Sequence, residues 1–146
     1  MTKSKIFIFS LLLLGLFSLQ LYAGQNSTDT VGLSGYDAVS YHTEKEAVKG
    51  SGKYALKHNG VTYLFSTEAN KNSFKNNPDK YLPAYGGYCA FGVAIGKKFS
   101  ADPEVWEIVD GKLYLNLDQD IQKKWQEDKS ANIFKGNKNW EEIKNS

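Results

Sequence analysis

Cysteine is nearly absent from this chain of 146 residues, since Cys89 is the only one. A single cysteine excludes an internal disulfide. Only two histidines, His42 and His58, accompany it. Because a structural zinc site usually takes four Cys or His ligands, the ligand set for a thiolate-rich metal centre is small. We therefore expect the hydrophobic core, rather than a cross-link, to stabilise the fold.

Arginine is also absent: all 18 basic residues are lysine, against 16 acidic residues. Arginine is the usual choice for bidentate contacts to phosphates and bases. Without it, and with a charge near zero once two N-terminal lysines are set aside, nucleic-acid binding is not expected. The sequence identifies no protein partner.

The N-terminus has the pattern of a secretory signal. Two lysines precede an apolar run, residues 6–19, which is shorter than a typical membrane span, and Ala23 offers a small residue for cleavage. The mature protein would be periplasmic or secreted without a stable membrane span, and an uncleaved anchor is the alternative. The sequence thus predicts three segments, namely a signal peptide (1–23), a flexible leader (24–34) and one domain (35–146).

A first β-hairpin is predicted around Asn59-Gly60, the preferred pair for a two-residue type I′ turn. It covers residues 53–66. The turn sets the register, so that Tyr54 would oppose Phe65. Alternate side chains of both strands should form a largely apolar core face.

A second hairpin is predicted around Asp110-Gly111, over residues 106–117. One face of this hairpin would carry Trp106, Ile108, Leu113, Leu115 and Leu117. The other face would carry Glu107, Val109, Lys112, Tyr114 and Asn116. The turn would place Trp106 opposite Leu115, and Trp106 should pack in the core rather than stack on a ligand.

Helix signals follow each hairpin. Ser66 or Thr67 can cap one helix, and Asn77 precedes a proline at the first position of another. Asp118 can cap a terminal helix, and Gly136 is expected to end a later helical turn. Two hairpins and at least two helices predict a small α+β domain. No internal repeat is apparent in the sequence.

Glycine surrounds the cysteine in the segment YGGYCAFGVAIGKKF, residues 85–99. Such a cysteine is a metal ligand, a reactive thiol or a small buried hydrophobe. A thiol-dependent enzyme would need a base near Cys89, for which His42 or His58 is available, and Asp37 to orient that base.

Several blocks occur together in order: GYDAVSY (35–41), VKGSGKY (48–54), GVTYLFST (60–67), residues 68–99 and DPEVWEIVDGKLYLN (102–116). They resemble the YHS-domain family, in its small secreted bacterial branch. The resemblance implies a treble-clef-like core and a role beside metal-handling proteins. Members that handle metals typically carry paired cysteines, whereas this chain has one.

The residues and the resemblance together predict a non-catalytic binding module for a transition metal, copper or zinc, or for a small ligand. A site with one thiolate and two imidazoles could suit copper. The candidate metal ligands are Cys89, His58, His42 and Asp37.

Tyrosines accompany glycine in the loop-like segments. Tyr36, Tyr85 and Tyr88 are candidate walls of a pocket for a small apolar or planar ligand, because aromatic faces with polar tips suit such sites. Alternatively, these tyrosines form the rim of the core. For the whole chain, the alternatives are a structural or protein-interaction module of the cell envelope, or a thiol-dependent enzyme that uses Cys89.

Overall fold

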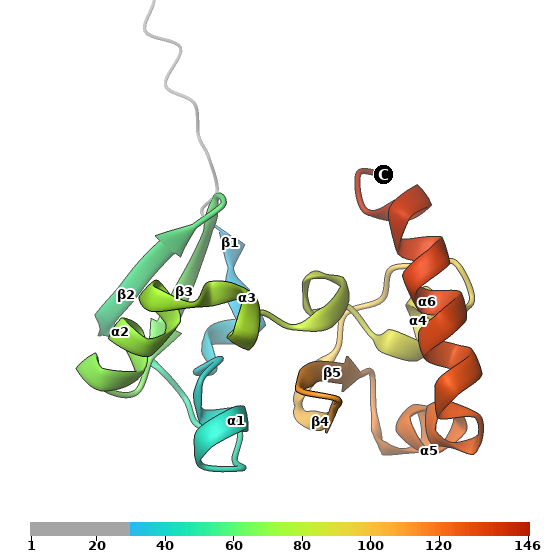
Figure 1. Cartoon of the computed structure of the whole chain (residues 1–146), viewed down its shortest axis with the longest axis horizontal. Helices are drawn as coiled ribbons and strands as arrows, with labels where there is room; N and C mark the ends of the chain where they lie inside the picture. The colour runs from blue at the N-terminus through green and yellow to red at the C-terminus, as the bar shows by residue number, and fades with distance from the viewer. Residues whose placement is uncertain (1–29) are drawn as a thin grey trace, which may run out of the picture.

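Residues 30–146 are described by the structure, which is a computed structural model. The predicted signal peptide and the predicted leader up to residue 29 lie outside this part of the chain. The described chain forms two halves, on either side of the segment that joins α3 to α4 (Figure 1). Both halves combine helices with a small hairpin, which confirms the predicted α+β class.

The first half is a hairpin flanked by helices. Its sheet has the order β1-β3-β2, with β1 parallel and β2 antiparallel to β3. Thr67 caps α2, because its side chain accepts the N–H of Asn70, and Pro78 opens α3. In chain order the elements are β1 (Thr30–Val31), the 3₁₀ turn η1 (Gly32–Gly35), α1 (Ser40–Thr43), β2 (Ser51–His58), β3 (Val61–Phe65), α2 (Glu68–Asn76) and α3 (Pro78–Tyr81).

The second half repeats this order of elements. Asp118 caps α5 and Asp128 caps α6, because the side chain of each accepts a backbone N–H of the first helical turn. β4 begins the same number of residues after β2 as α5 begins after α2. We call this spacing the step along the chain that relates the two units. The elements are η2 (Ala84–Gly87), α4 (Ala90–Ala94), β4 (Asp102–Val109), β5 (Lys112–Asn116), α5 (Gln119–Glu127) and α6 (Lys129–Ile143).

The correspondence between the halves extends to single backbone pairs. Val31 pairs with Thr62 in the first half, and Pro83 pairs with Leu113 in the same parallel sense in the second. The step along the chain that relates the strands and helices also relates these two pairs, to within a single position. The same structural unit therefore occurs twice, although no repeat is apparent in the sequence.

The predicted registers hold beside both turns and fail farther along the first hairpin. Trp106 pairs with Leu115 as predicted. Phe65 pairs with Ser51 rather than with Tyr54, because a bulge in β2 shifts the register. The second hairpin has the same irregularity at the equivalent place. The type of turn therefore predicts the pairing of residues in a hairpin only up to the first irregularity in the backbone hydrogen bonds between its strands.

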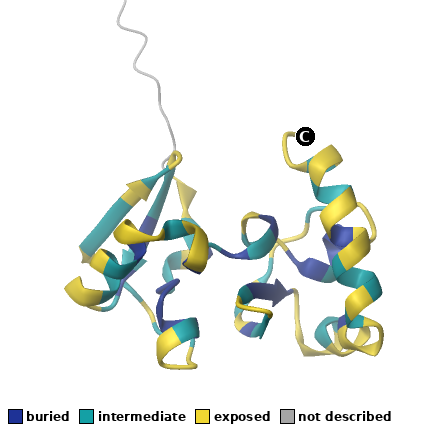
Figure 2. Ribbon diagram, in the orientation of Figure 1, coloured by how far each residue is buried: buried dark blue, intermediate teal, exposed yellow. Residues whose placement is uncertain are grey.

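The second hairpin lies between two clusters of buried side chains. Because strand side chains alternate, Leu113 and Leu115 pack with the core of the first half, whereas Tyr114 packs with Trp125 in the second. Figure 2 shows the buried segments inside each half and along the connection between them. β5 is thus covered on both faces and joins the two units into one small domain. Leu117 follows β5 and is exposed, unlike the other residues predicted for its face.

Helix α6 runs through Gly136, so the prediction that this glycine ends a helical turn is wrong. Gly136 is buried against the ring of Tyr85. A Cβ at this position would lie 2.5 Å from the Tyr85 hydroxyl oxygen. The glycine therefore provides room for a neighbouring side chain instead of a break in the helix.

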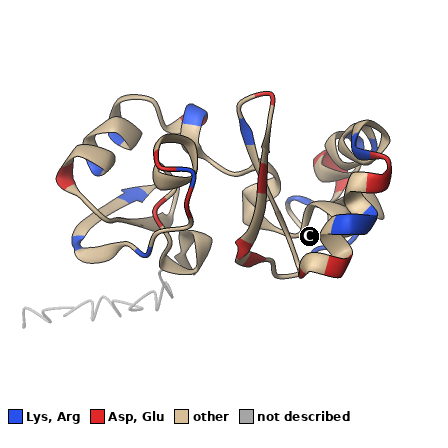
Figure 3. Ribbon diagram, turned by 90° about the horizontal axis from the view of Figure 1, so that it is seen from below, with Lys and Arg blue, Asp and Glu red and all other residues tan. Residues whose placement is uncertain are grey.

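Charged residues of both signs are interspersed along the described chain (Figure 3). Within residues 30–146, no helix is both long enough and apolar enough to cross a membrane.

Candidate functional site

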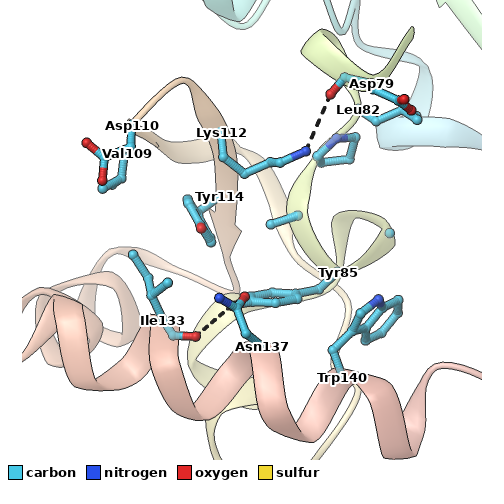
Figure 4. A pocket seen from close by; sticks show the side chains of 13 residues that line it. Asp79, Leu82, Tyr85, Val109, Asp110, Lys112, Tyr114, Ile133, Asn137 and Trp140 are labelled. Atoms are coloured by element: carbon cyan, nitrogen blue, oxygen red, sulfur yellow. Dashed lines mark hydrogen bonds between the residues drawn. The ribbon is translucent and has the colours of Figure 1, made fainter.

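A cavity of about 580 Å³ lies between the second hairpin, η2 and α6 (Figure 4). Three aromatic side chains line it: Tyr85 from η2, Tyr114 from β5 and Trp140 from α6. The side chains of Lys112 and Asn137 add polar atoms to the wall. This volume lies in the range of pockets that bind small molecules, which are typically apolar with a few oriented polar groups.

Tyr85 occupies the centre of this site in a strained backbone conformation. Its φ of 56° lies in the left-handed region, which a residue with a Cβ seldom adopts. The strain is offset by close packing in the slot at Gly136. The hydroxyl donates toward Asn137 Oδ1 at 3.0 Å and the Ile133 carbonyl oxygen at 3.3 Å. Tyr85 is thereby held rigidly against α6.

The other two rings stand around Tyr85. The centroid of the Tyr85 ring is 5.8 Å from that of Tyr114 and 6.0 Å from that of Trp140. Tyr114 in turn contacts the buried ring of Trp125 at 5.4 Å. These spacings are favourable for aromatic pairs, so the rings hold one another in place.

The polar groups that line the cavity include the ammonium group of Lys112, two tyrosine hydroxyls and the carboxylates of Asp79 and Asp110. Lys112 extends across one side of the cavity, and its Nζ donates to the backbone oxygen of Asp79 at 3.4 Å (Figure 4). Burial raises the pKa of Tyr85 and of Tyr114, and for Tyr114 the charge of Asp110 adds to this. Both phenols therefore stay protonated at neutral pH and act as neutral groups.

The three tyrosines proposed as pocket walls occupy different places. Tyr85 lines this cavity, and Tyr88 lines a second cavity on the other side of η2. Tyr36 lines neither of these two cavities, and its hydroxyl donates to Glu104 at 2.8 Å.

Sequence reasoning missed Tyr114 and Trp140 as cavity residues. The alternation of the second hairpin already separates Tyr114 from the leucines on either side of it. Trp140 follows Gly136 by four positions, so the two lie on the same face of a helix. The strand alternation at Tyr114 and the spacing of Gly136 and Trp140 are therefore visible in the sequence. Nothing in the sequence shows that η2 packs on the helix face that carries Gly136 and Trp140.

Cys89 is buried, with 1% of its surface exposed, at the start of α4. Its Sγ accepts the N–H of Gly92 at 3.5 Å and donates toward Asn116 Oδ1 at 3.7 Å. The same Asn116 oxygen accepts the N–H of Phe91 at 3.1 Å. The thiol and the amide thus satisfy the first N–H groups of a short helix.

Asp37 holds the position in the first unit that Cys89 holds in the second. Its Oδ1 accepts the N–H of Val39 at 2.8 Å and that of Ser40 at 3.4 Å. Its Oδ2 accepts the N–H and hydroxyl of Ser66 and the side-chain amide of Asn70. A fully buried carboxylate is therefore satisfied by five hydrogen-bond donors, which ties α1 to the end of β3 and to α2.

The two histidines lie in different surroundings within the first half. His42, in α1, packs edge-on against Tyr81, and its Nε2 is buried without a hydrogen-bond partner among the described residues. His58, at the turn end of β2, contacts Phe74 and the side chain of Asn59. Burial, followed by the charges of Lys45, Lys80 and Lys112, lowers the pKa of His42.

These placements do not fit a transition-metal site. In residues 30–146, no group of three or more Cys, His, Asp or Glu side chains is arranged to hold a metal ion. Cys89 and Asp37 use their acceptor atoms to cap backbone N–H groups, each in its own unit. The candidate ligands Cys89, His58, His42 and Asp37 therefore do not form one first coordination sphere.

The geometry defines a small α+β protein in which one structural unit occurs twice beside an aromatic cavity. Residues 39–85 match the family model described as the YHS domain, which confirms the resemblance for this segment. The match covers most of the first unit. No curated protein and no solved structure matches the chain.

Proposed function

We propose that this protein is a non-catalytic binding module, and that its ligand is a small planar molecule that packs against the wall formed by Tyr85, Tyr114 and Trp140. The observation that carries the proposal is the preorganised aromatic wall around a cavity of about 580 Å³. Rings at this spacing offer faces and edges to a flat ligand, which gains contact area with little ordering cost.

Lys112 gives this ligand a polar requirement. Its ammonium group lies at the cavity and is engaged by a backbone oxygen at 3.4 Å, a long hydrogen bond. An anionic group on the ligand would form a stronger, charge-assisted bond with the same Nζ. The cavity is therefore suited to an aromatic ligand whose acidic substituent lies at Lys112, directed away from the carboxylates of Asp79 and Asp110 that also line it.

The test uses 8-anilinonaphthalene-1-sulfonate, an aromatic sulfonate whose emission rises when it leaves water. We expect it to bind the full-length chain at a saturable site. Lys112→Met should weaken the affinity by roughly three- to tenfold, the effect of one partly exposed charged contact. Trp140→Leu should weaken it by roughly a similar factor through lost ring contact.

The matched control is Lys75→Met, which removes a lysine from the exposed end of α2, outside both cavities. It should leave the affinity unchanged. If Lys112→Met and Trp140→Leu bind the probe as tightly as the wild type does, the aromatic cavity is not the binding site and the proposal is wrong.

Metal binding is a second hypothesis, and the match of residues 39–85 to the YHS domain supports it. It requires a ligand set that differs from the arrangement of Cys89, His42 and His58 described above. Elemental analysis and titration of Cu(I), Cu(II) and Zn(II) into wild type and Cys89→Ala would test it. Stoichiometric binding that the substitution abolishes would support a Cys89 metal site, binding that it leaves unchanged would require ligands other than Cys89, and the absence of binding would reject the hypothesis.

Two further alternatives have simple tests. A thiol-dependent enzyme needs an accessible, activated Cys89, which rapid alkylation of the folded protein would reveal. A protein-interaction module is supported by Phe134, which is 74% exposed on α6. Loss of a cross-linked partner on Phe134→Ser would favour that alternative.

We also propose that the protein is exported to the periplasm or secreted. The support is the basic, apolar and small-residue pattern of residues 1–23, which lie outside the described part of the chain. The N-terminal sequence of the protein recovered from cells tests this, because cleavage after Ala23 would leave Gly24 as the first residue.

A further inference from the structure

A second cavity, of about 440 Å³, lies where the two units meet. The first unit contributes residues 30–34, Val61 and Tyr63 to its wall. The second unit contributes residues of η2, the 100–103 segment and Leu115. The connection η2 separates this cavity from the first, because Pro83 and Gly86 line both.

The internal repeat relates the two cavities. Val61 and Tyr63 correspond to Lys112 and Tyr114 by the step that relates the hairpins, and residues 30–34 correspond to residues 82–86 by the step from η1 to η2, which is one residue longer. Every one of these counterparts lines the first cavity. Each unit therefore has a cavity on the same face. This face is formed by the left-handed turn and the hairpin strand that follows it.

The aromatic packing beneath the two cavities is also repeated. The ring of Tyr63 is 5.0 Å from that of Phe74 and tilted by 35°. Its counterpart Tyr114 is 5.4 Å from Trp125 and tilted by 36°. Both tyrosines are buried, so each cavity has a tyrosine in its wall that is fixed by the same kind of ring contact.

The units differ in what closes each cavity. In the second unit, the long helix α6 supplies Ile133, Asn137 and Trp140. In the first unit, the equivalent helix α3 is a single turn and leads through Leu82 to Pro83. The second unit takes the place of a long helix and closes the first unit's cavity with Tyr88, Ser100 and Leu115.

The chemistry of the two walls differs in charge. Val61 stands where the first cavity has Lys112. In the part of the chain that the structure describes, no charged side chain lines the second cavity. Val31 and Tyr88 keep 45% and 37% of their surface exposed there, so its mouth offers apolar area to a ligand. An ionic ligand would lose its hydration without a partner.

From this geometry we infer that the chain has a second small-molecule site, at the junction of its two units, which binds an uncharged, largely apolar ligand. The site is the first unit's version of the aromatic cavity, with its ionic contact replaced by valine. It is independent of the ligand proposed for the first cavity, because the two share only the η2 wall.

The experiment compares two probes with the same ring system on the full-length chain. N-phenyl-1-naphthylamine is uncharged, and 8-anilinonaphthalene-1-sulfonate carries a sulfonate. Ser100→Trp fills the second cavity from an exposed loop position, and Val31→Asp places a charge in its wall. We expect each variant to weaken binding of the uncharged probe at least tenfold and to leave the sulfonate probe unaffected.

Ser130→Trp, on an exposed position of α6 outside both cavities, is the matched control and should change neither probe. Circular dichroism confirms that each variant is folded. Unchanged affinity for the uncharged probe in both Ser100→Trp and Val31→Asp would overturn the inference, even if Lys112→Met still weakened the sulfonate probe. If both variants lose the uncharged probe, and the wild type does not bind the sulfonate probe, the result would support this second site and reject the ligand proposed for the first cavity.

Discussion

Gly136→Ala should destabilise the protein, although the same change in an ordinary exposed helix stabilises it. Alanine has the higher helix propensity, by about 1 kcal/mol. Here the new Cβ would lie 2.5 Å from Tyr85 Oη and 2.8 Å from Cζ. Tyr85 cannot withdraw freely, because its ring is buried between Tyr114 and Trp140 and its hydroxyl is bonded to α6.

The opposing contributions set the size of the effect. Overpacking a buried site costs about 1–3 kcal/mol, and loss of a hydroxyl hydrogen bond adds about 1 kcal/mol. After the gain in helix propensity, we expect the free energy of unfolding to fall by about 1–3 kcal/mol. Urea denaturation followed by far-UV circular dichroism measures this change.

Two further variants make the reasoning refutable. Gly52→Ala is the matched control, because a Cβ there has no atom within 4 Å and its stability should be unchanged or slightly higher. Tyr85→Leu removes the ring, so the cost of Gly136→Ala should largely disappear in the double variant. A Gly136→Ala protein as stable as wild type, or more stable, would show that Tyr85 does not fill this slot.

Three other changes test the described contacts. Asp37→Asn should lower the free energy of unfolding by about 2–4 kcal/mol, because one amide oxygen cannot accept the five bonds of the buried carboxylate; urea denaturation measures it, and an unchanged midpoint would contradict it. His42 has a lowered pKa in the folded state, so the unfolded state binds more protons below the ordinary histidine pKa, and stability should fall as pH drops from 7 through that range. His42→Gln should flatten this profile, and a profile as steep in that variant as in the wild type would refute the assignment. Cys89 should react with iodoacetamide far more slowly in the folded protein than in urea, because its Sγ is buried; equal rates would show that it is open to solvent.

The elements of this protein follow from short-range rules. Asn59-Gly60 and Asp110-Gly111 have positive φ at each turn residue, as the type I′ turn requires, and the pairing beside each turn follows from it. The capping side chain of Thr67 and the proline after Asn77 begin helices where the sequence predicts them. These features depend on close neighbours in the chain, so they are readable without the fold.

The binding hypotheses depend on contacts between distant residues, and the sequence was a poorer guide to them. Cys89, His42 and His58 are the most conspicuous candidates in the sequence, yet Cys89 caps a short helix and the histidines pack elsewhere. Trp140 lies far along the chain from Tyr85, and only the docking of α6 on η2 brings their rings together. The residue types alone therefore do not say which side chains the fold brings together.

Composition and local pattern determined by themselves that this is a small α+β protein with two hairpins, without disulfides and with a predicted export signal. Tertiary structure decided that the two hairpins belong to equivalent units. The repeat is nearly invisible in the sequence, because Asp37 and Cys89 both cap backbone N–H groups but do so with different atoms. Hydrogen-bond geometry and ring packing preserve the unit while residue identity changes, and so the paired cavities emerge only when the chain is folded.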